Sequence, residues 1–573
     1  MKSSRLILLS ILISACGACW ACAPQAGGGD NIDDVYKEEP EKPGPDPGDG
    51  TSWRSKLYPA DWTPGYADAQ GRFLHDFSYA GYHSGLRDIP VSGLRVTDVT
   101  KTPYNADPTG TADATAAIQA AIDALGAQGG GVVYLPAGTY RLSLQSGNNV
   151  LTINKPNVVL RGAGPDKTFL LNTTTSMRSK SIIGMSKSAS WDTPNSTEVA
   201  LTEDVLKPSA TLPVQSPSTF SKGDLVVVMS DVTEAFCQDY KIGADWSGMV
   251  GDHSRGPHFF REVTAVSANS ITLDAPTRYR LLKRDNARVY KVADPLTECG
   301  IEHLAIGNIQ NPKTNGWGEE DYSTSGNGAY EVHASHAIKL GNVMNCWVLD
   351  VKTFRPAGND ETIHLLSNGI VINDSRFVTV KNCDFERSQY EGGGGNGYMY
   401  TLGGNDCLVV DCHAEHGRHN YDFKSMKANG NVVLRCSSKT PSLASDFHMH
   451  LSMANLIDGF QSDKDHFEAS FRPYGSAGVR HMYSATECVF WNTKGLSADK
   501  TGVCVISLQP GYGYVIGTSG ACSGVKSTPV SGTISGTAYE TAPEDWVEGV
   551  GKGETLAPQS LYEDQLKKRK ARL

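Results

Sequence analysis

The sequence contains little charge and almost no long hydrophobic stretch. Only 20% of its 573 residues are charged, and the net charge is −10, so it lacks the basic excess of a nucleic-acid-binding protein. After the first residues, no segment is apolar enough to span a membrane. We therefore expect no nucleic-acid partner and no transmembrane span. An acidic protein can still carry a locally basic groove for an acidic ligand.

Cysteines are present, but they lack the dense spacing of a disulfide scaffold. Three of the 13 lie in or beside the first apolar stretch, and the other ten are spread along the chain. Export would favour disulfides, whereas a repeat that contains several of these cysteines favours stacked, buried thiols. Both states stay open at this point. The 60 glycines and the low charge are not typical of a disordered chain or a coiled coil.

The first residues are typical of an export signal. Lys2 and Arg5 precede an apolar stretch, 6–13, that is too short to span a bilayer, and residues 13–16 resemble a bacterial lipobox. We predict a lipoprotein signal peptide over 1–16 with Cys16 as the lipidated residue. Residues 17–50 are predicted to be a flexible tether, because they are rich in Gly, Pro, Asp and Glu. The expected location is the outer membrane, exposed at the cell surface, with the lipid as the sole membrane contact.

The segment 106–140 predicts how the folded part begins. A helical pattern at 114–125 is followed by a glycine turn and a strand that ends at Pro136. This sequence pattern, continued by residues 158–164, resembles that of the pectate-lyase-3 type of proteins. The resemblance implies a right-handed parallel β-helix whose first turn is closed by the helix, and it implies a fold, not a reaction.

The remaining chain divides by its patterns into four parts. Residues 51–199 are predicted to form the cap and the first turns of the β-helix, and 293–535 the main β-helix with the active-site groove. Between them, 200–292 alternate like the strands of a small antiparallel barrel, which predicts an inserted domain. Residues 536–573 are predicted to be a C-terminal tail. The fold class is therefore all-β.

Two repeats indicate the length of one turn of the solenoid, here called a coil. Six cysteines in similar contexts suggest one position seen six times, with separations that shrink to 24 residues: Cys299, Cys346, Cys383, Cys412, Cys436 and Cys488. Three triplets recur at 24-residue steps: 422–424, 446–448 and 470–472. Because successive side chains of a strand face opposite sides, we expect Phe423, Phe447 and Phe471 to stack inward. Lys424, His448 and Arg472 would form an outward column.

That column is the candidate site, because basic groups stacked on a sheet repel one another unless they have partners or a function. Asp422 and Asp446 could be such partners, in which case the column would be an ordinary solvent face. Seven of the 15 histidines fall between His413 and His481, which favours function. We predict catalytic roles for five residues: Lys424, His448, Arg472, His450 and Tyr474. We predict substrate binding by five others: Arg418, His419, Tyr421, Tyr400 and His481.

A mixture of His, Lys, Arg and Tyr suits β-elimination of an acidic, uronate-containing polysaccharide. That reaction needs a cation to neutralise the uronate, a base for the C5 proton and an acid for the leaving oxygen. Arg472 or Arg418 would neutralise, Lys424 or His448 would be the base, and Tyr474 or His450 the acid. Lys424 and Ser425, with Asn429 beyond them, resemble the rung that carries the base in alginate and chondroitin-B lyases of β-helix fold. Chondroitin sulfate or hyaluronan is the favoured substrate; pectin, alginate and ulvan are alternatives.

Two other functions stay open. A glycosidase of β-helix fold would need two facing carboxylates, to be drawn from Asp384, Glu386, Asp422, Asp446 and Glu468. A non-catalytic glycan-binding protein would need an aromatic surface, to be drawn from Tyr390, Tyr398, Tyr400 and Tyr421. No cofactor is certain. Stacked Asp422 and Asp446 are candidate ligands for Ca²⁺, and no other metal is expected.

Overall fold

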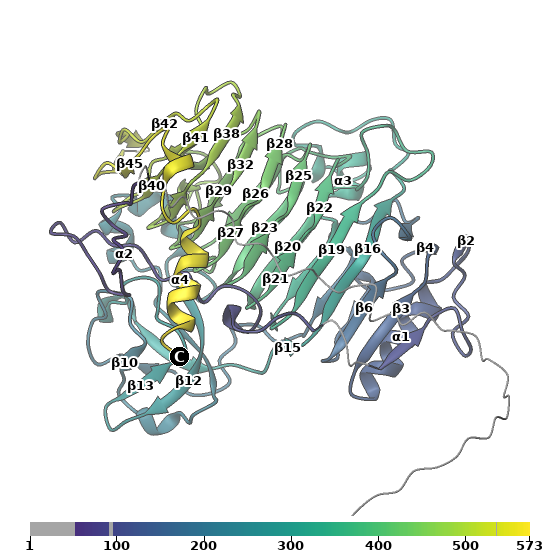
Figure 1. Ribbon diagram of the computed structural model, residues 1–573, viewed down its shortest axis with the longest axis horizontal. Coiled ribbons are helices and arrows are strands. Elements are labelled where there is room, and N and C mark those ends of the chain that lie inside the picture. Colours follow the sequence, from purple (N-terminus) through teal and green to yellow (C-terminus); the bar gives the residue numbers. More distant parts are fainter. Residues whose placement is uncertain (1–51, 91–94, 535) are drawn as a thin grey trace, which may run out of the picture. The chain divides into compact units, whose positions relative to one another are not determined.

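The computed structural model describes residues 52–90, 95–534 and 536–573. Cys16, the signal peptide and the tether lie outside the described residues. The main body consists of parallel strands that pair with the strands of the next coil (Figure 1). Three sheets run along it, so the fold is the predicted right-handed parallel β-helix.

The first sheet joins strands one coil apart over the whole length of the body. Its strands are β1 (Val96–Asp98), β3 (Gly131–Leu135), β6 (Val158–Gly162), β16 (Gly300–Asn308), β19 (Trp347–Thr353), β21 (Thr379–Lys381), β24 (Leu408–Val410), β27 (Val432–Leu434), β31 (Leu456–Asp458), β37 (Val489–Trp491), β40 (Tyr514–Ile516) and β45 (Trp546–Glu548).

The second sheet shares the long strands β16 and β19 with the first. Its other strands are β2 (Thr109–Asp113), β4 (Gly138–Leu142), β7 (Thr168–Asn172), β22 (Asp384–Glu386), β25 (His413–Glu415), β28 (Ser437–Lys439), β32 (Gln461–Asp463), β38 (Lys494–Ser497) and β41 (Ser519–Gly520).

The third sheet carries the candidate site. Its strands are β5 (Asn149–Ile153), β8 (Ser181–Ser186), β17 (His336–Gly341), β20 (Asn368–Arg376), β23 (Tyr398–Asn405), β26 (His419–Lys424), β29 (Ser445–Met449), β33 (Phe467–Ala469), β39 (Val505–Ser507) and β42 (Val525–Lys526). Short parallel strands accompany it: β15 (Leu296–Thr297), β18 (Val343–Met344), β30 (Ser452–Met453) and β36 (Ala485–Thr486).

Helix α1 (Thr115–Ala127) closes the first coils, as the sequence predicted. Ile118, Ala121, Ile122 and Leu125 recur on one face and are buried. This spacing of three and four residues forms the apolar stripe with which a helix packs onto a core. In Figure 1 the helix lies over β3 and β6 at one end of the solenoid.

The inserted domain is an antiparallel sheet in the order β10-β13-β12-β11-β14-β9. Its strands are β9 (Val199–Ala200), β10 (Thr211–Pro213), β11 (Leu225–Met229), β12 (His258–Val266), β13 (Ser270–Leu273) and β14 (Arg288–Lys291). A bridge between Leu201 and Val214 joins the two edges, so the sheet closes like a barrel. Short helices follow the third strand: α2 (Glu234–Asp239) and the 3-10 helix η4 (Gly243–Met249).

The predicted tail, 536–573, contains regular structure. It holds β44 (Thr537–Glu540), which pairs with β43 (Ser531–Ile534), the last coil strand β45, and helix α4 (Leu561–Lys570). Leu561 and Tyr562 pack with Leu57 and Trp62 over apolar side chains of the first sheet. The segment therefore covers a sheet face that water would otherwise contact.

All ten cysteines among the described residues are free and buried, which answers the question left open between thiols and disulfides. They do not share one position, however. Cys299 pairs in register with Cys346 at one corner of the coil, whereas Cys383, Cys412 and Cys436 stack at another. The two corners look alike in sequence because each places a small buried residue directly before a strand. The strand belongs to the first sheet at one corner and to the second sheet at the other.

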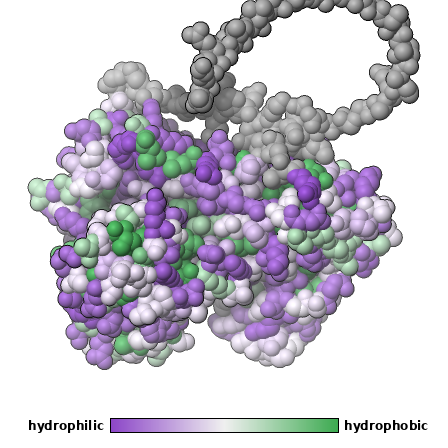
Figure 2. All heavy atoms as spheres, turned by 90° about the horizontal axis from the view of Figure 1, so that it is seen from below, coloured by the Kyte–Doolittle hydropathy of each residue, from purple (hydrophilic) through white to green (hydrophobic). Residues whose placement is uncertain are grey.

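Among the described residues, no helix has the length and hydrophobicity to cross a membrane. The face in Figure 2 carries hydrophobic residues in small separate patches among hydrophilic ones. A short helix, α3 (Gly328–Val332), lies in the long loop between β16 and β17. That loop, and others on the same side, border the site.

Candidate active site

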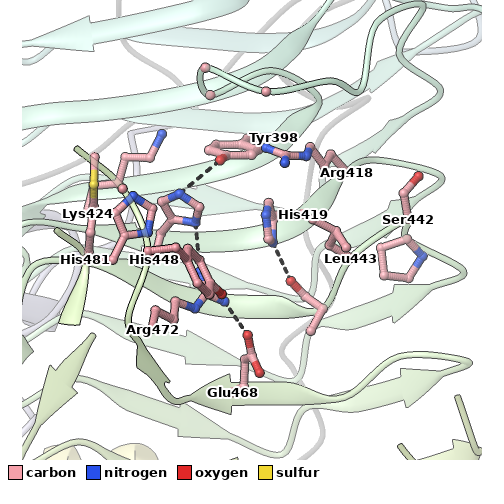
Figure 3. A pocket seen from close by; sticks show the side chains of 18 of the residues that line it. Tyr398, Arg418, His419, Lys424, Ser442, Leu443, His448, Glu468, Arg472 and His481 are labelled. Carbon is pink, nitrogen blue, oxygen red and sulfur yellow. Dashed lines mark hydrogen bonds and ion pairs between the residues drawn. The ribbon is translucent and has the colours of Figure 1, made fainter. Parts of the chain in front are cut away.

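A cleft of about 1080 Å³ lies along the outer face of the third sheet. Its floor is formed by side chains of β23, β26 and β29, and by Arg472 of β34 (Phe471–Arg472) (Figure 3). Loops form its walls, at 319–322, 393–395, 441–444, 474–481 and 498–501. Eight of the ten predicted site residues line this cleft: Lys424, His448, Arg472, His450, Tyr474, Arg418, His419 and His481.

The 24-residue coil brings the central residues together. Asp422 pairs with Asp446 and Phe423 with Phe447, in the predicted register. The two phenylalanine rings stack inward with their centroids 4.6 Å apart. A β-bulge follows, in which Lys424 pairs with Met449, so that the strand has one extra residue at His448. Such a bulge re-aims side chains, and His448 turns into the cleft.

Tyr400 and Tyr421 are not substrate-binding residues, and this prediction is wrong. Both are buried in the core, where their rings stack with centroids 4.9 Å apart. Their hydroxyls donate to the backbone carbonyl oxygens of His413 and Cys412, at 2.9 and 3.0 Å. The physical reason is alternation: Tyr421 lies two residues before the inward-facing Phe423 and so faces the same side.

The third triplet does not continue the stack. Glu468, not Ser470, pairs with Asp446, and Phe467 packs against Phe447 with the ring centroids 5.7 Å apart. Phe471 belongs to β34, which runs antiparallel to β35 (Met482–Tyr483). The predicted ladder is therefore wrong beyond Phe447, because this coil leaves the sheet as a hairpin.

Arg472 reaches the cleft floor from that hairpin and is buried, with 3% of its surface exposed. Its Nη2 lies 2.5 Å from Oδ2 of Asp446, and it also forms an ion pair with Glu468. Burial alone would lower the pKa of Arg472, but the charges of these two carboxylates raise it above its ordinary value. With both partners satisfied, Arg472 holds the floor together and is not a free cation for a substrate.

Tyr398 and His448 are in contact at the floor of the cleft, and this contact is called the centre below. The Tyr398 hydroxyl lies 3.3 Å from Nε2 of His448, and Nδ1 of His448 lies 3.1 Å from Oδ2 of Asp446. Nδ1 of His448 also lies 3.1 Å from Nη1 of Arg472. The tautomer with its proton on Nδ1 donates to Asp446 and accepts from Tyr398, whereas the tautomer with its proton on Nε2 accepts from Arg472 and donates to Tyr398. Asp446 and Arg472 together orient the imidazole, and in the first of these tautomers a basic nitrogen faces the phenol.

Three histidines around this contact are neutral at neutral pH: His419, His448 and His481. Burial, with the charge of Arg472 also contributing, holds the pKa of His448 well below its ordinary value. Burial likewise lowers the pKa of His419 and of His481 to about 4. Burial raises the pKa of Tyr398, so its hydroxyl keeps its proton. The centre therefore pairs a proton acceptor with a proton donor.

Two cations remain for an acidic substrate near this centre. Nζ of Lys424 lies 4.1 Å from the centre of the Tyr398 ring and 3.7 Å from Oδ2 of Asp422. Nη2 of Arg418 lies 2.6 Å from Oε1 of the exposed Glu319 on the opposite wall. Exposed ion pairs are weak, so a substrate carboxylate can displace Glu319.

The two predicted proton donors lie farther from the centre. Nε2 of His450 lies 3.2 Å from the carbonyl oxygen of Val479, and the His450 ring lies against Trp246 of the inserted domain. Tyr474 is 56% exposed at the rim, with its ring centroid 5.7 Å from that of His481. They can contact a substrate, but neither touches His448 through a described interaction.

The inserted domain holds one wall of the cleft in place. The indole Nε1 of Trp246 donates to the carbonyl oxygen of Arg480 at 2.9 Å, and Oδ1 of Asp245 lies 3.1 Å from Nε of Arg480. Arg480 belongs to the loop that carries Tyr474 and His481 into the cleft. The insertion is thus part of the site's architecture.

The sequence placed Tyr398 in the wrong role, as part of an aromatic surface. Tyr398 and His419 are paired at the starts of β23 and β26. Strand alternation would turn both inward, like Tyr400 and Tyr421 two residues later. A corner of the coil at this point interrupts the alternation, and both side chains face the cleft. At that corner the buried Asn420 donates to the carbonyl oxygen of Ala414 at 3.0 Å. A glycine-rich segment directly before Tyr398 was the available signal, since such segments flank functional grooves.

The alternative chemistries find less support. Asp384 and Glu386 lie on the second sheet and do not line the cleft. Burial would raise the pKa of Glu468, but bonds to His466 and the charge of Arg472 lower it to about 2, which disqualifies it as a general acid. Tyr390 is buried too, so the proposed aromatic surface does not form.

A Ca²⁺ site at Asp422 and Asp446 does not fit the residues present. The one described group of three metal-binding side chains here is His419, Asp446 and His448, which offers two nitrogens where Ca²⁺ prefers oxygens. The guanidinium of Arg472 already lies against Asp446 and would repel a cation. Arg472 neutralises Asp446, and Lys424 lies 3.7 Å from Asp422, so no step of the chemistry is derived through a metal.

Comparison with known proteins confirms the resemblance seen in the sequence. Residues 97–209 match the family described as rhamnogalacturonase A/epimerase, pectate lyase-like. This part of the chain is therefore pectate-lyase-like. The match lies outside the residues that line the cleft, and so it concerns the framework and not the site.

One group of curated relatives shares a short segment. The mannuronan C5-epimerase AlgE3 of Azotobacter vinelandii is 56% identical over 63 residues, which cover 11% of this chain and 3% of the relative. The solved tailspike of E. coli bacteriophage HK620, in complex with a pentasaccharide, aligns over 74% of this chain and 57% of its own with 9% identity and a TM-score of 0.39. The A-module of the Azotobacter vinelandii epimerase AlgE6 aligns over 80% and 99% with 13% identity and a TM-score of 0.27.

Proposed function

We propose that this protein is an enzyme that cleaves an acidic, uronate-containing polysaccharide by β-elimination. The observation that carries the proposal is the contact between the Tyr398 hydroxyl and Nε2 of His448 on the floor of the cleft. It supplies an acceptor and a donor of protons within 3.3 Å of each other. The proton on C5 and the oxygen on C4 of a uronate are attached to neighbouring carbon atoms, so one such pair of side chains can serve both.

In the proposed reaction, Lys424 and Arg418 neutralise the uronate carboxylate, which makes the C5 proton more acidic. Neutral His448 takes that proton, and the electron pair of the C–H bond forms the C4–C5 double bond. The bond from C4 to the glycosidic oxygen breaks, and the Tyr398 hydroxyl protonates that oxygen. The proton on His448 then passes to the Tyr398 phenolate, which restores the site. Asp446 stabilises the imidazolium in between.

The substrate we favour is a glycosaminoglycan such as chondroitin sulfate or hyaluronan. We further propose that Cys16 carries a lipid and that the tether displays the enzyme at the cell surface, where such polymers are met. No step of the proposed chemistry uses Ca²⁺, so we expect activity to survive treatment with a chelator.

C5 epimerisation is the second candidate, favoured by the 63-residue likeness to mannuronan C5-epimerases. It begins with the same proton removal, but a proton returns to the opposite face of C5 and no bond to oxygen breaks. The site would then need a proton donor on the far side of the sugar. His481 does not supply it, because burial lowers its pKa to about 4 and its ring centroid lies 4.9 Å from that of His448.

The test is digestion of a panel of acidic polysaccharides, followed by ultraviolet absorbance, reducing ends and deuterium uptake from heavy water. New reducing ends with a rise in absorbance support the lyase, since elimination alone makes an unsaturated uronate. Deuterium at C5 without cleavage would move the assignment to an epimerase. Reducing ends without absorbance would make it a hydrolase, and binding with no reaction a glycan-binding protein.

A further inference from the structure

We propose that the end of the cleft formed by residues 464–466 and 498–501 is a second anionic subsite. It would bind the carboxylate or sulfate of another sugar unit of the same polysaccharide chain. This inference rests on the proposed function, because it assumes an acidic polymer in the cleft.

The first evidence is the pairing state of the cations that line the cleft. Four of the six Lys and Arg side chains there have carboxylate partners: Arg255, Arg418, Lys424 and Arg472. The other two, Lys464 and Lys500, are exposed and make no ion pair with any described residue. Carboxylates line this end as well, but they are bound to other groups: Asp465 to the hydroxyls of Ser438 and Ser445, Asp499 to His466, and Glu468 to Arg472. Two lysines that share one end of a cleft and have no ion-pair partner favour the arrival of an anion.

The second evidence is that this end of the cleft is held in a defined shape. The backbone N–H of Lys464 donates to the hydroxyl of Ser497 on the next coil at 3.1 Å. Oδ1 of Asp499 accepts from the backbone N–H and the hydroxyl of Thr501, at 2.8 and 2.5 Å. Oδ2 of Asp499 lies 2.7 Å from Nδ1 of the buried His466. Asp499 therefore anchors the turn that presents Lys500 beside the segment of Lys464, directly after β32.

The third evidence is the separation from the reaction centre. Because Asp446 pairs with Glu468, His466 lies opposite Ala444, four residues before His448. At the strand rise of about 3.3 Å per residue, this offset is on the order of 10 Å. That is longer than one sugar ring, so an anion bound here belongs to a different unit from the one that reacts.

The ligand chemistry follows from the two ammonium groups. Lysine binds anions as a mobile point charge, without the fork that arginine offers to a carboxylate. The subsite therefore accepts either a carboxylate or a sulfate ester. A polymer whose acidic groups are far apart along the chain would gain no affinity from this subsite.

The test compares the double variant Lys464→Ala/Lys500→Ala with the wild type on sulfated chondroitin, unsulfated hyaluronan and their shortest cleavable fragments. Loss of two exposed charge contacts should raise KM for the polymers by about 3- to 30-fold with kcat unchanged. The shortest fragments, which cannot reach the subsite, should show no change. A larger effect on chondroitin sulfate than on hyaluronan would identify sulfate as the group bound, and equal effects the carboxylate.

The control is Lys494→Ala, which removes a lysine outside the cleft that forms an ion pair with Glu554 at 2.7 Å. A double variant with the same KM as this control overturns the subsite while the wild type remains an active enzyme. A fall in kcat with unchanged KM would also overturn it. If the wild type binds but cleaves nothing, the same comparison is made with dissociation constants, and if it neither binds nor cleaves, the proposed function itself fails.

Discussion

The hydroxyl of Tyr398 lies 3.3 Å from Nε2 of His448, although 50 residues separate them in the chain. The two residues come from β23 and β29, which lie on either side of β26 in the third sheet. The ring of His419, from the intervening strand, packs against both, with centroid distances of 4.9 and 5.1 Å. The donor and the acceptor of the proposed reaction thus meet across two coils.

We expect Tyr398→Phe to lower kcat by about 10²- to 10⁴-fold, because it removes the proton donor and keeps the ring. Tyr474→Phe, at the exposed rim, is the matched control and should stay within a few-fold of the wild type. Steady-state kinetics on the best polysaccharide of the panel provide the measurement. Equal losses in the two variants would mean that the proton comes from elsewhere.

Arg472→Ala should unfold the site as well as inactivate it. The change leaves Asp446 and Glu468 buried beside each other without their cation, which costs about 3–5 kcal/mol of unfolding free energy. Lys424→Ala should cost less than about 1 kcal/mol, because that side chain is partly exposed. This contrast reflects the burial of Arg472, for which the sequence predicted an outward-facing position. Urea denaturation of both variants decides it, and similar midpoints would contradict the burial described here.

Phe447→Ala should destabilise the fold by about 3–5 kcal/mol, since the ring is fully buried between Phe423 and Phe467. Phe471→Ala should cost clearly less, because Phe471 is half-buried in the hairpin and packs on Tyr539. The melting temperatures of the two variants show whether Phe467 or Phe471 continues the stack after Phe447. If Phe471→Ala melted as early as Phe447→Ala, Phe471 would be as deeply buried as Phe447. That result would support the predicted stack of three phenylalanines at 24-residue steps.

Stability should depend on pH through Asp458, which anchors helix α4. Its Oδ2 accepts from the Ser560 hydroxyl at 2.7 Å and from the Tyr562 N–H at 2.9 Å, and burial raises its pKa to about 7. An unfolded Asp has a pKa of about 3.9. Between these values the unfolded chain binds fewer protons, so stability falls as the pH rises from about 4 to 7.

Asp458→Asn keeps the acceptor oxygen but cannot ionise, so the variant does not lose this stability as the pH rises. Its stability relative to the wild type should therefore rise between pH 4 and 7 and level off above pH 7, by at most about 4 kcal/mol. Urea midpoints at pH 4, 5.5 and 8 measure the trend. A difference that does not change with pH would show that Asp458 is ionised in the folded protein.

Cys16→Ser tests the predicted anchor. The variant should leave the membrane fraction and lose labelling by a fatty-acid probe, because the thiol that would carry the lipid is gone. Cys19→Ser is the control and should stay with the membrane. An unchanged distribution of Cys16→Ser would refute lipidation at this position.

Local patterns in the sequence determined the framework of this protein. The apolar stripe of α1, the coil length and the stacking of Phe423 on Phe447 could all be predicted, because helix periodicity, strand alternation and strand spacing depend on neighbouring residues. The same rules predicted that Lys424 and His448 share a cleft face. Applied consistently, they would also have placed Tyr421 inside.

Only the tertiary structure decided the chemistry of the site. A corner before Tyr398, a bulge at His448 and a hairpin that returns Arg472 each interrupt the strand alternation on which the sequence argument rests. The wall that carries His481 depends on contacts with the inserted domain, more than 200 residues away in the chain. Which side chains touch is set by such long-range contacts and local irregularities, and these leave no periodic trace in the sequence.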